Sequence, residues 1–295
     1  MPELPEVETV RIGLDGLLPG RTIASQKHDW PRGFPNSPQD VAQFLIGASV
    51  TAVRRRAKVL IIDVSTNYSL VIHLKMTGQL VFRSKTAAFG AGHPNASLVG
   101  ELPDKSTRVT LTFTDGSRLF FNDQRKFGWM RLLPTAEVEE LDFFKKVGPE
   151  PLAADFTADI FIERLNRRAK SGIKAVLLDQ TVVAGIGNIY ADESLWLAKI
   201  HPETKVGDVP VARLKKLYEG LLAVLRLSIQ KGGSTDRNYV DATGKRGSYL
   251  TFANVFRREG QPCTRCGTVI IKTRVAGRGT HTCPVCQPAP QQKEK

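Results

Sequence analysis

The hydrophobic pattern of the chain changes from the period of strands to that of helices near residue 148, and this change limits the possible folds more than any other feature of the sequence. Residues 50–133 contain short segments rich in branched side chains and separated by turn signals, as is typical of β-strands. Residues 109–113 alternate between apolar and polar side chains, and Asp115-Gly116 is a hairpin signal that leads to the next segment. This half of the chain predicts an antiparallel β-sandwich.

Beyond the Gly-Pro-Glu-Pro segment at residues 148–151 the period becomes helical. Thr157 is a suitable N-cap for a helix that runs toward Lys170, and residues 211–225 carry apolar side chains at helical spacing. A helix is also predicted at residues 5–18, ahead of the strands. We expect residues 83–105, which are rich in Gly, Ala, Pro and Ser, to form a surface loop.

All four cysteines of the chain form two Cys-x-x-Cys pairs near its C-terminus: Cys263 with Cys266, and Cys283 with Cys286. Two such knuckles can place four thiolates tetrahedrally around one Zn²⁺, and four sulfur ligands leave no open position, so the metal would be structural. Two disulfides are the alternative. They are disfavoured because the N-terminus has acids where a secretion signal needs basic and apolar residues.

These patterns predict an α+β protein in five parts. We expect a β-sandwich domain at 1–134 with its N-terminal helix, a connector at 135–152 and a helical domain at 153–256. A zinc ribbon hairpin at 257–287 and a flexible tail at 288–295 would follow.

The balance of charge indicates a polyanionic partner. The 295 residues contain 42 Lys and Arg against 29 Asp and Glu, a formal net charge of +13. Residues 231–295 contain 12 basic and 4 acidic side chains, so this fifth of the chain carries more than half of the surplus. We interpret it as a nucleic-acid-binding face. No apolar run approaches the ~18 residues that a membrane helix needs.

The first residues offer a nucleophile. If the initiator methionine is removed, Pro2 has a free α-amine. The pKa of an α-amine, about 8, is lower than the ~10.4 of lysine, so more of it is unprotonated near neutral pH. Glu3 and Glu6 would place carboxylates beside it for general acid–base catalysis. The ordinary explanation also stands, because acidic side chains stabilise a helix N-terminus.

Several turns carry further candidate contacts. Residues 185–190 form a glycine turn that opens a helix, where backbone N–H groups and Asn188 could bind an anion. Lys58 follows three arginines and leads into an apolar strand, although such a run is usually a solvated edge. Met76 and Phe127 lie in polar turns. Such residues are more often part of a core, but apolar wedges accompanied by Arg can unstack a base.

Seven motifs together resemble the formamidopyrimidine-DNA glycosylase / endonuclease VIII family. They are MPELPEVETV, the RRAK of residues 55–58, HLKMTG, DQRKFG, GPEPL, LLDQ-x4-GIGNIYADESLW and the four-cysteine ribbon, in the family's order from residue 1 to 287. The first and fourth motifs resemble the formamidopyrimidine-DNA glycosylase branch. The resemblance implies a β-sandwich with an N-terminal helix, a helix–two-turn–helix domain with a zinc hairpin, and DNA bound between them.

The resemblance also implies roles for particular residues. Pro2 would be the nucleophile, Glu3 the general acid with Glu6 in support, Lys58 the residue of β-elimination and Arg278 that of δ-elimination. Other side chains would contact DNA: Met76, Arg125 and Phe127 in the gap left by an extruded base, and His73, Asn188 and either Arg168 or Lys170 at phosphates. Residues 232–250 correspond to the loop over the lesion. Ser106 stands where the family often has His, so this phosphate contact would be weakened or moved to Arg108.

The resemblance implies a bifunctional DNA glycosylase/AP lyase that excises oxidised purines from damaged double-stranded DNA. The same chemistry on oxidised pyrimidines is one alternative, and a non-catalytic zinc-ribbon DNA-binding protein is another. We expect an intracellular, cytoplasmic and nucleoid-associated monomer with one structural Zn²⁺ and no membrane partner.

Overall fold

The computed structural model describes residues 2–93, 95–234 and 249–290. The chain divides into two compact units, of which the first contains Met1–Lys146 with Ile229–Ser248 and the second Val147–Ser228 with Tyr249–Lys295. Each unit has a hydrophobic core of its own. No helix in the described ranges is long and apolar enough to cross a membrane.

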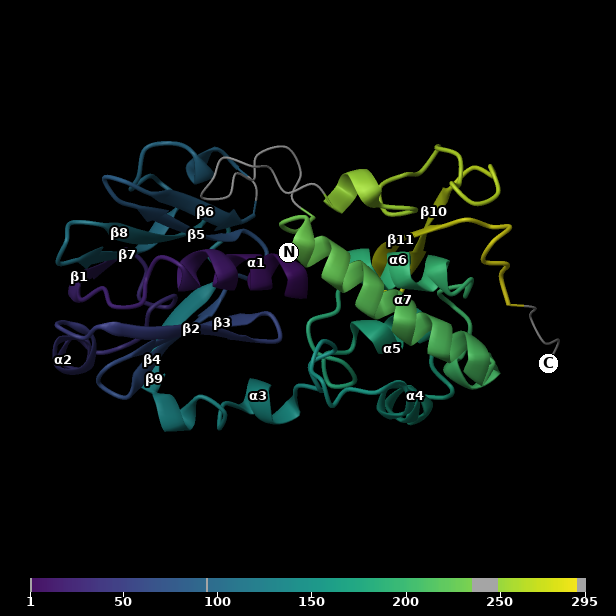
Figure 1. The fold of residues 1–295 in the computed structure, drawn as a ribbon, viewed down its shortest axis with the longest axis horizontal. Coiled ribbons are helices and arrows are strands. Elements are labelled where there is room, and N and C mark those ends of the chain that lie inside the picture. Colours follow the sequence, from purple (N-terminus) through teal and green to yellow (C-terminus); the bar gives the residue numbers. More distant parts are fainter. Residues whose placement is uncertain (1, 94, 235–248, 291–295) are drawn as a thin grey trace. The chain divides into compact units, whose positions relative to one another are not determined.

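The first unit combines one long helix with two antiparallel sheets (Figure 1). The five-stranded sheet has the order β1-β7-β8-β5-β6, and the four-stranded sheet has the order β2-β3-β4-β9. The strands are β1 (Ile23–His28), β2 (Val50–Arg56), β3 (Val59–Val64), β4 (Tyr68–His73), β5 (Gly78–Arg83), β6 (Ala88–Gly92), β7 (Thr107–Phe113), β8 (Arg118–Asp123) and β9 (Trp129–Pro134). The helices are α1 (Leu4–Asp15), α2 (Pro38–Asp40) and α3 (Asp142–Lys146). The predicted N-terminal helix and antiparallel sheets are confirmed.

Helix α1 is attached to both sheets through its apolar face. Val7, Val10 and Leu14 are fully buried and belong to the same core as the apolar side chains of the two sheets. This core is the reason that the helix lies on the sandwich, since burying one Val or Leu side chain contributes roughly 1.5–3 kcal/mol. Because α1 begins at Leu4, the packing also fixes the position of the chain's first residues.

The glycine-rich stretch that we expected to be a loop contains strand β6. Its glycines permit close backbone contact: a Cβ on Gly92 would lie 2.4 Å from the carbonyl oxygen of Gly78, on the paired strand β5. Gly13 of α1 permits close contact with a side chain of β6, since a Cβ on Gly13 would lie 2.1 Å from the ring of Phe89. The small residues therefore mark a tightly packed strand here, where composition alone indicates a loop.

The second unit consists of helices and one small hairpin. The helices are α4 (Ala158–Asn166), α5 (Ile173–Leu178), α6 (Asn188–Leu197) and α7 (Val211–Gln230), and the hairpin is formed by β10 (Ile271–Val275) and β11 (Arg278–Thr282). Short helical turns in the two units are Val41–Leu45, Ala96–Leu98, Thr135–Glu137, Val206–Asp208 and Tyr249–Phe252. The predicted cap of α4 is confirmed, because the Thr157 hydroxyl accepts a hydrogen bond from the N–H of Ile160. The helix ends at Asn166, four residues earlier than Lys170.

Candidate functional site

The N-terminal end of α1 is a buried cluster of acidic side chains beside Pro2. Pro2, Glu3 and Glu6 are all buried. The backbone N–H of Glu3 donates to the Glu6 carboxylate at 2.9 Å, in a capping box that places Glu6 back over the first turn. The other oxygen of Glu6 accepts a hydrogen bond from the N–H of Ser234 at 2.8 Å.

The approach of residues 232–234 to Glu6 depends on glycine. Gly233 has a φ of +90°, and a Cβ at this position would lie 3.3 Å from both Cγ and Oε1 of Glu6. Any other residue would be strained here and would crowd the carboxylate. The helix N-terminus and the segment that follows α7 are thus held together at Glu6.

Lys58 lies in the β2–β3 turn and is only 6 % exposed. The preceding Ala57 has a φ of 53°, and its carbonyl oxygen accepts a hydrogen bond from Arg55 at 2.8 Å. Arg55 also forms a 2.8 Å ion pair with Glu8 on α1. The turn that carries Lys58 is therefore tied to the helix that begins beside Pro2.

His73 ends strand β4 and is buried in its neutral form. Burial, with the nearby charges of Lys75 and Lys58, lowers the pKa of His73 to about 3. Its Nδ1 accepts a hydrogen bond from the N–H of Lys75 at 3.0 Å, which assigns the remaining proton to Nε2. His73 can therefore offer a ligand a neutral N–H donor. Strand pairing places His73 opposite Val59, the residue that follows Lys58.

One buried carboxylate that sequence reasoning missed connects two of the predicted turns. Asp123 is fully buried at the end of β8. It accepts hydrogen bonds from the hydroxyl of Thr77, the N–H of Arg125 at 3.2 Å and the N–H of Gly128 at 2.6 Å. The turn that contains Met76 is thus joined to the turn of residues 124–128. The only sequence signal was the acid that opens the DQRKFG motif.

The second of these turns presents an aromatic ring to solvent. Phe127 is 53 % exposed, and the guanidinium carbon of Arg125 lies 4.7 Å from the centre of its ring. Met76, on the turn that Asp123 joins to it, is half-buried. A large exposed aromatic side chain under a cation is unusual for a residue of the core, and the pair has the composition of a wedge for base steps.

Ser106 and Arg108 do not share this exposure. Ser106 is buried and bonded to Asp104 at 2.7 Å. Arg108 is 6 % exposed, and its guanidinium donates to Asp29, to the carbonyl oxygen of Lys105 at 2.6 Å and to that of Asp123 at 2.8 Å. These internal hydrogen bonds use three of the five guanidinium N–H groups, and the expected transfer of a phosphate contact to Arg108 stays a prediction.

In the second unit, Asn188 and the zinc hairpin are in direct contact. The Asn188 amide donates to the carbonyl oxygen of Gly279 at 2.9 Å. Arg278 is the exposed residue immediately before it, and it follows a two-residue turn in which both Ala276 and Gly277 have positive φ, as in a type I′ hairpin. Asn188 at the start of α6 and Arg278 at the start of β11 are thus brought together.

Arg168 and Lys170 are both exposed in the loop after α4. Nη2 of Arg168 lies 3.8 Å from Oδ2 of Asp179. The geometry favours neither residue over the other as the phosphate contact.

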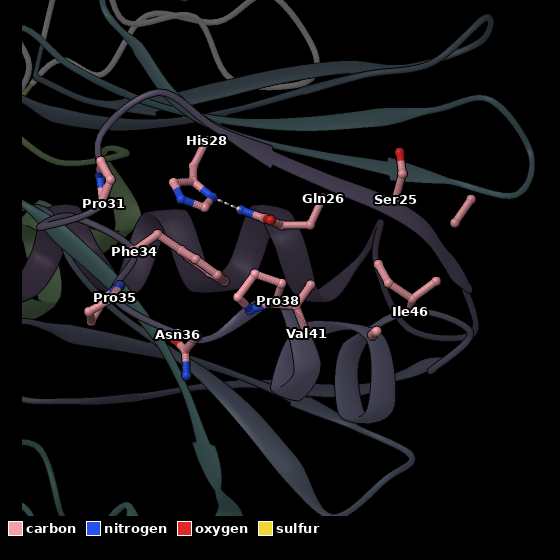
Figure 2. Close-up of a pocket in the computed structure, with 12 residues that line it drawn as sticks. Ser25, Gln26, His28, Pro31, Phe34, Pro35, Asn36, Pro38, Val41 and Ile46 are labelled. Carbon is pink, nitrogen blue, oxygen red and sulfur yellow. Dashed lines mark hydrogen bonds between the residues drawn. The ribbon is translucent and has the colours of Figure 1, made fainter.

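The structure also contains a cavity that includes none of the predicted site residues. It has a volume of about 520 Å³ and lies beside strand β1 of the first unit (Figure 2). Apolar side chains such as Phe34 and Val41 line it, and Gln26 and His28 form a 3.1 Å hydrogen bond at one side.

The four cysteines of the second unit have the geometry of a metal site. Their sulfur atoms all lie within 4.8 Å of one another. The N–H of Arg265 donates to Cys263 at 3.5 Å, and the N–H of Cys286 donates to Cys283 at 3.4 Å. Hydrogen bonds from Thr268 lower the pKa of Cys266 to about 6, whereas burial raises the pKa values of Cys283 and Cys286. Zinc binding would have to remove the protons of these two thiols.

Comparisons with known proteins agree with this architecture. Residues 1–130 match the formamidopyrimidine-DNA glycosylase N-terminal domain, residues 147–239 match the formamidopyrimidine-DNA glycosylase H2TH domain, and residues 260–289 match the zinc finger found in FPG and IleRS. The formamidopyrimidine-DNA glycosylase of Chloroflexus aurantiacus is 44% identical over 296 residues, covering 100% of both chains. The chain belongs to the formamidopyrimidine-DNA glycosylase family. It is therefore an enzyme, and its four cysteines form a structural zinc site.

Solved structures of the family resemble the chain along nearly its whole length. A mutant of the Lactococcus lactis FPG, in complex with a Fapy-dG-containing DNA, has a TM-score of 0.86 and 37% identity and covers 98% of this chain and 100% of its own. The wild-type Lactococcus lactis Fpg, in complex with an oxidised-pyrimidine-containing DNA, has a TM-score of 0.84 and 36% identity with the same coverage. Of the predicted site, Met1 and residues 235–248 lie outside the described residues.

Proposed function

We propose that the chain is a bifunctional DNA glycosylase/AP lyase of base-excision repair that removes oxidised purines, 8-oxoguanine and formamidopyrimidines, from damaged double-stranded DNA. One observation carries the proposal: Pro2 is buried beside Glu3 and Glu6, on a helix to which the turn of Lys58 is tied. Removal of Met1 would turn this buried proline nitrogen into a secondary amine beside two carboxylates, which suits a nucleophile assisted by general acid–base catalysis.

The proposed reaction begins with the secondary amine of Pro2. Its nitrogen attacks C1′ of the damaged nucleotide, the bond from C1′ to the base breaks, and the base leaves with a proton. Glu3 protonates the ring oxygen of the sugar, and the opened sugar forms an iminium with Pro2. Glu6 holds the backbone of Glu3 in place through the capping box.

Strand cleavage follows from the acidity that the iminium gives to C2′. Loss of the C2′ proton expels the 3′ phosphate in the β-elimination, in which Lys58 acts. A second proton loss expels the 5′ phosphate in the δ-elimination, in which Arg278 acts, and hydrolysis of the iminium then frees Pro2. The zinc, held by four sulfur atoms, keeps the hairpin of Arg278 folded.

Chemistry at C1′ requires that the damaged nucleotide leave the base stack. Flipping costs a few kcal/mol, and less for a damaged base than for a paired normal one. We assign the filling of the gap to Met76, Arg125 and Phe127, because Phe127 is exposed under Arg125 and Asp123 fixes the turns of all three. His73, Asn188 and Arg168 or Lys170 are assigned to phosphates.

Trapping of the iminium tests the proposal directly. Duplexes with 8-oxoguanine or an oxidised pyrimidine opposite cytosine or a purine are incubated with the protein and borohydride, which reduces the iminium to a stable adduct. The wild type is expected to give an adduct with 8-oxoguanine. Pro2→Ala, in which the primary amine of alanine replaces the secondary amine of proline, is expected to give much less. Pro19→Ala, which replaces an exposed proline of the same unit, is the matched control and should react like the wild type.

The same experiment separates the alternatives. No adduct with any damaged base would exclude the iminium at Pro2 and the lyase reaction that depends on it. A faster reaction with the oxidised pyrimidine would reverse the lesion preference, and the Lactococcus lactis complex gives this alternative a specific basis. An adduct that forms at full yield in Pro2→Ala would place the nucleophile elsewhere. The mass of the purified protein should show that Met1 has been removed, because a retained Met1 leaves Pro2 without a free amine.

A further inference from the structure

The three residues that follow Arg278 are each held by a polar group of another element in the second unit. The carbonyl oxygen of Gly279 accepts hydrogen bonds from Asn188 at 2.9 Å and from the ammonium of Lys174 at 3.4 Å. The hydroxyl of Thr280 lies 2.6 Å from Lys174, and the N–H of His281 donates to Asp192 at 3.0 Å. Strand β11 is thus held from Gly279 onward.

Two of these partners are a fully buried ion pair. Lys174 on α5 and Asp192 on α6 have no exposed side-chain surface, and Nζ lies 2.6 Å from Oδ1. The other carboxylate oxygen of Asp192 also lies 3.2 Å from Nδ1 of His281. Lys174 and Asp192 therefore each bind the hairpin and also bind each other.

Apolar packing does little to hold this part of the hairpin. The residues of β10 from Ile271 to Arg274 are exposed, and so are Arg278 and Gly279. The apolar cluster beneath the ribbon consists of Trp196, Val255, Ile270 and two of the cysteines, away from the hairpin turn. A buried ion pair contributes little net stability, because desolvation offsets most of the attraction, but its hydrogen bonds are directional. The hydrogen bonds of the Lys174–Asp192 pair therefore orient strand β11, which makes few apolar contacts of its own.

We propose that Asp192, with Lys174 as its counter-ion, is a positioning residue for Arg278. It acts through strand β11, which follows Arg278 directly, and it serves the δ-elimination while base excision at Pro2 proceeds without it. The proposal rests on the function proposed above, in which Arg278 takes part in δ-elimination.

The test uses a variant that removes both charges together. A single substitution at either position would leave a buried charge without its partner and could unfold the unit. In Lys174→Met/Asp192→Asn, side-chain size is kept and no charge remains. The measurement is the ratio of β,δ-cleaved to β-cleaved DNA in a reaction without borohydride, and the yield of the borohydride adduct is measured in a parallel reaction. This ratio counts only protein that has completed base excision, so it does not depend on the folded fraction.

The double variant should keep its zinc and its adduct yield and lose δ-elimination by between about ten- and a hundredfold, the range for misplacement of a catalytic group. Lys174→Arg, which keeps the charge, should retain the ratio of the wild type. Arg278→Ala should show the same loss, and adding it to the double variant should cause no further loss, because both changes remove one function.

Each failure has a distinct meaning. An unchanged ratio in the double variant, with a lowered ratio in Arg278→Ala, would overturn the positioning role and leave the proposed function intact. An unchanged ratio in Arg278→Ala would remove Arg278 from the δ-elimination and overturn the positioning role with it. Losses that add in the triple variant would show that Asp192 acts independently of Arg278, which also overturns the proposal.

Discussion

At the residue scale, His73 shows how one buried side chain connects the site to the stability of the protein. Its pKa is lowered from 6.5 to about 3, chiefly by burial. Between pH 6.5 and 3, the imidazole of His73 is therefore protonated in the unfolded chain and neutral in the folded protein. The contribution of neutral His73 to stability is complete above pH 6.5 and is lost as the pH falls toward 3, at about 1.4 kcal/mol per pH unit.

The prediction is that His73→Gln removes this part of the acid sensitivity. Urea unfolding of the wild type and the variant at pH 4, 5, 6 and 7 measures it. The difference in unfolding free energy between the two proteins should change in favour of the variant as the pH decreases. A constant difference over this range would contradict the lowered pKa.

At the element scale, Asp123 joins the turn after β4 to the turn after β8, and each turn carries a part of the proposed wedge. Asp123→Asn would replace an oxygen that accepts from a backbone N–H by an NH₂ group, so one buried N–H would lose its partner. The unfolding free energy is expected to decrease by about 1–3 kcal/mol. The kcat/KM of base excision should decrease by more than this loss of stability explains, because Arg125 and Phe127 are no longer fixed.

Asp115→Asn is the matched control for this variant. Asp115 also caps a turn in the same unit, through Ser117 at 2.6 Å, but none of the proposed site residues lies on that turn. It should lower stability and leave kcat/KM for base excision unchanged. If both variants lose activity in proportion to their stability, Asp123 has no role beyond folding.

The elements also show which parts of the fold were predictable from the sequence. The β7–β8 hairpin was predicted because alternation and an Asp-Gly turn are local signals, and Gly116 indeed has a φ of +83°. Strand β6 was missed because its small residues are explained only by their contacts with α1 and β5. Asp192 was missed for a similar reason: it is buried by His281, 89 residues later in the chain.

The candidate site divides in the same way. The cysteine cluster followed from spacing alone. The residues themselves indicated an amine nucleophile at Pro2 beside Glu3, and the family resemblance added the specific roles of Pro2, Glu3 and Lys58, which stay predictions. Ser106 and Arg108 could not be judged from the sequence, because only the fold shows that their polar atoms are bonded inside the protein.

At the scale of the whole molecule, the zinc site and the surplus of positive charge concern the same part of the chain. The hairpin between the cysteine pairs has almost no apolar core, so the four thiolates and the polar contacts of Lys174 and Asp192 are what hold it. Phosphate contacts release counterions, so DNA affinity depends on how many basic side chains are held in place. Loss of the metal should release Arg278 and the basic side chains near it together.

Chelation of zinc is therefore expected to weaken DNA binding by at least about tenfold while the first unit stays folded, since structural zinc contributes its binding energy to the folding of its own domain. Fluorescence anisotropy measures the affinity with a labelled duplex that carries a tetrahydrofuran analogue of the abasic site, which cannot form the iminium and is not cleaved. Circular dichroism of the sheet follows the first unit, which contains strands β1 to β9. Readdition of Zn²⁺ should restore binding, and Cys263→Ser should reproduce the loss without a chelator. If metal-free protein binds DNA with unchanged affinity, the folded hairpin does not contribute to DNA affinity. The positive charge of residues 231–295 would then attract DNA without the folded hairpin.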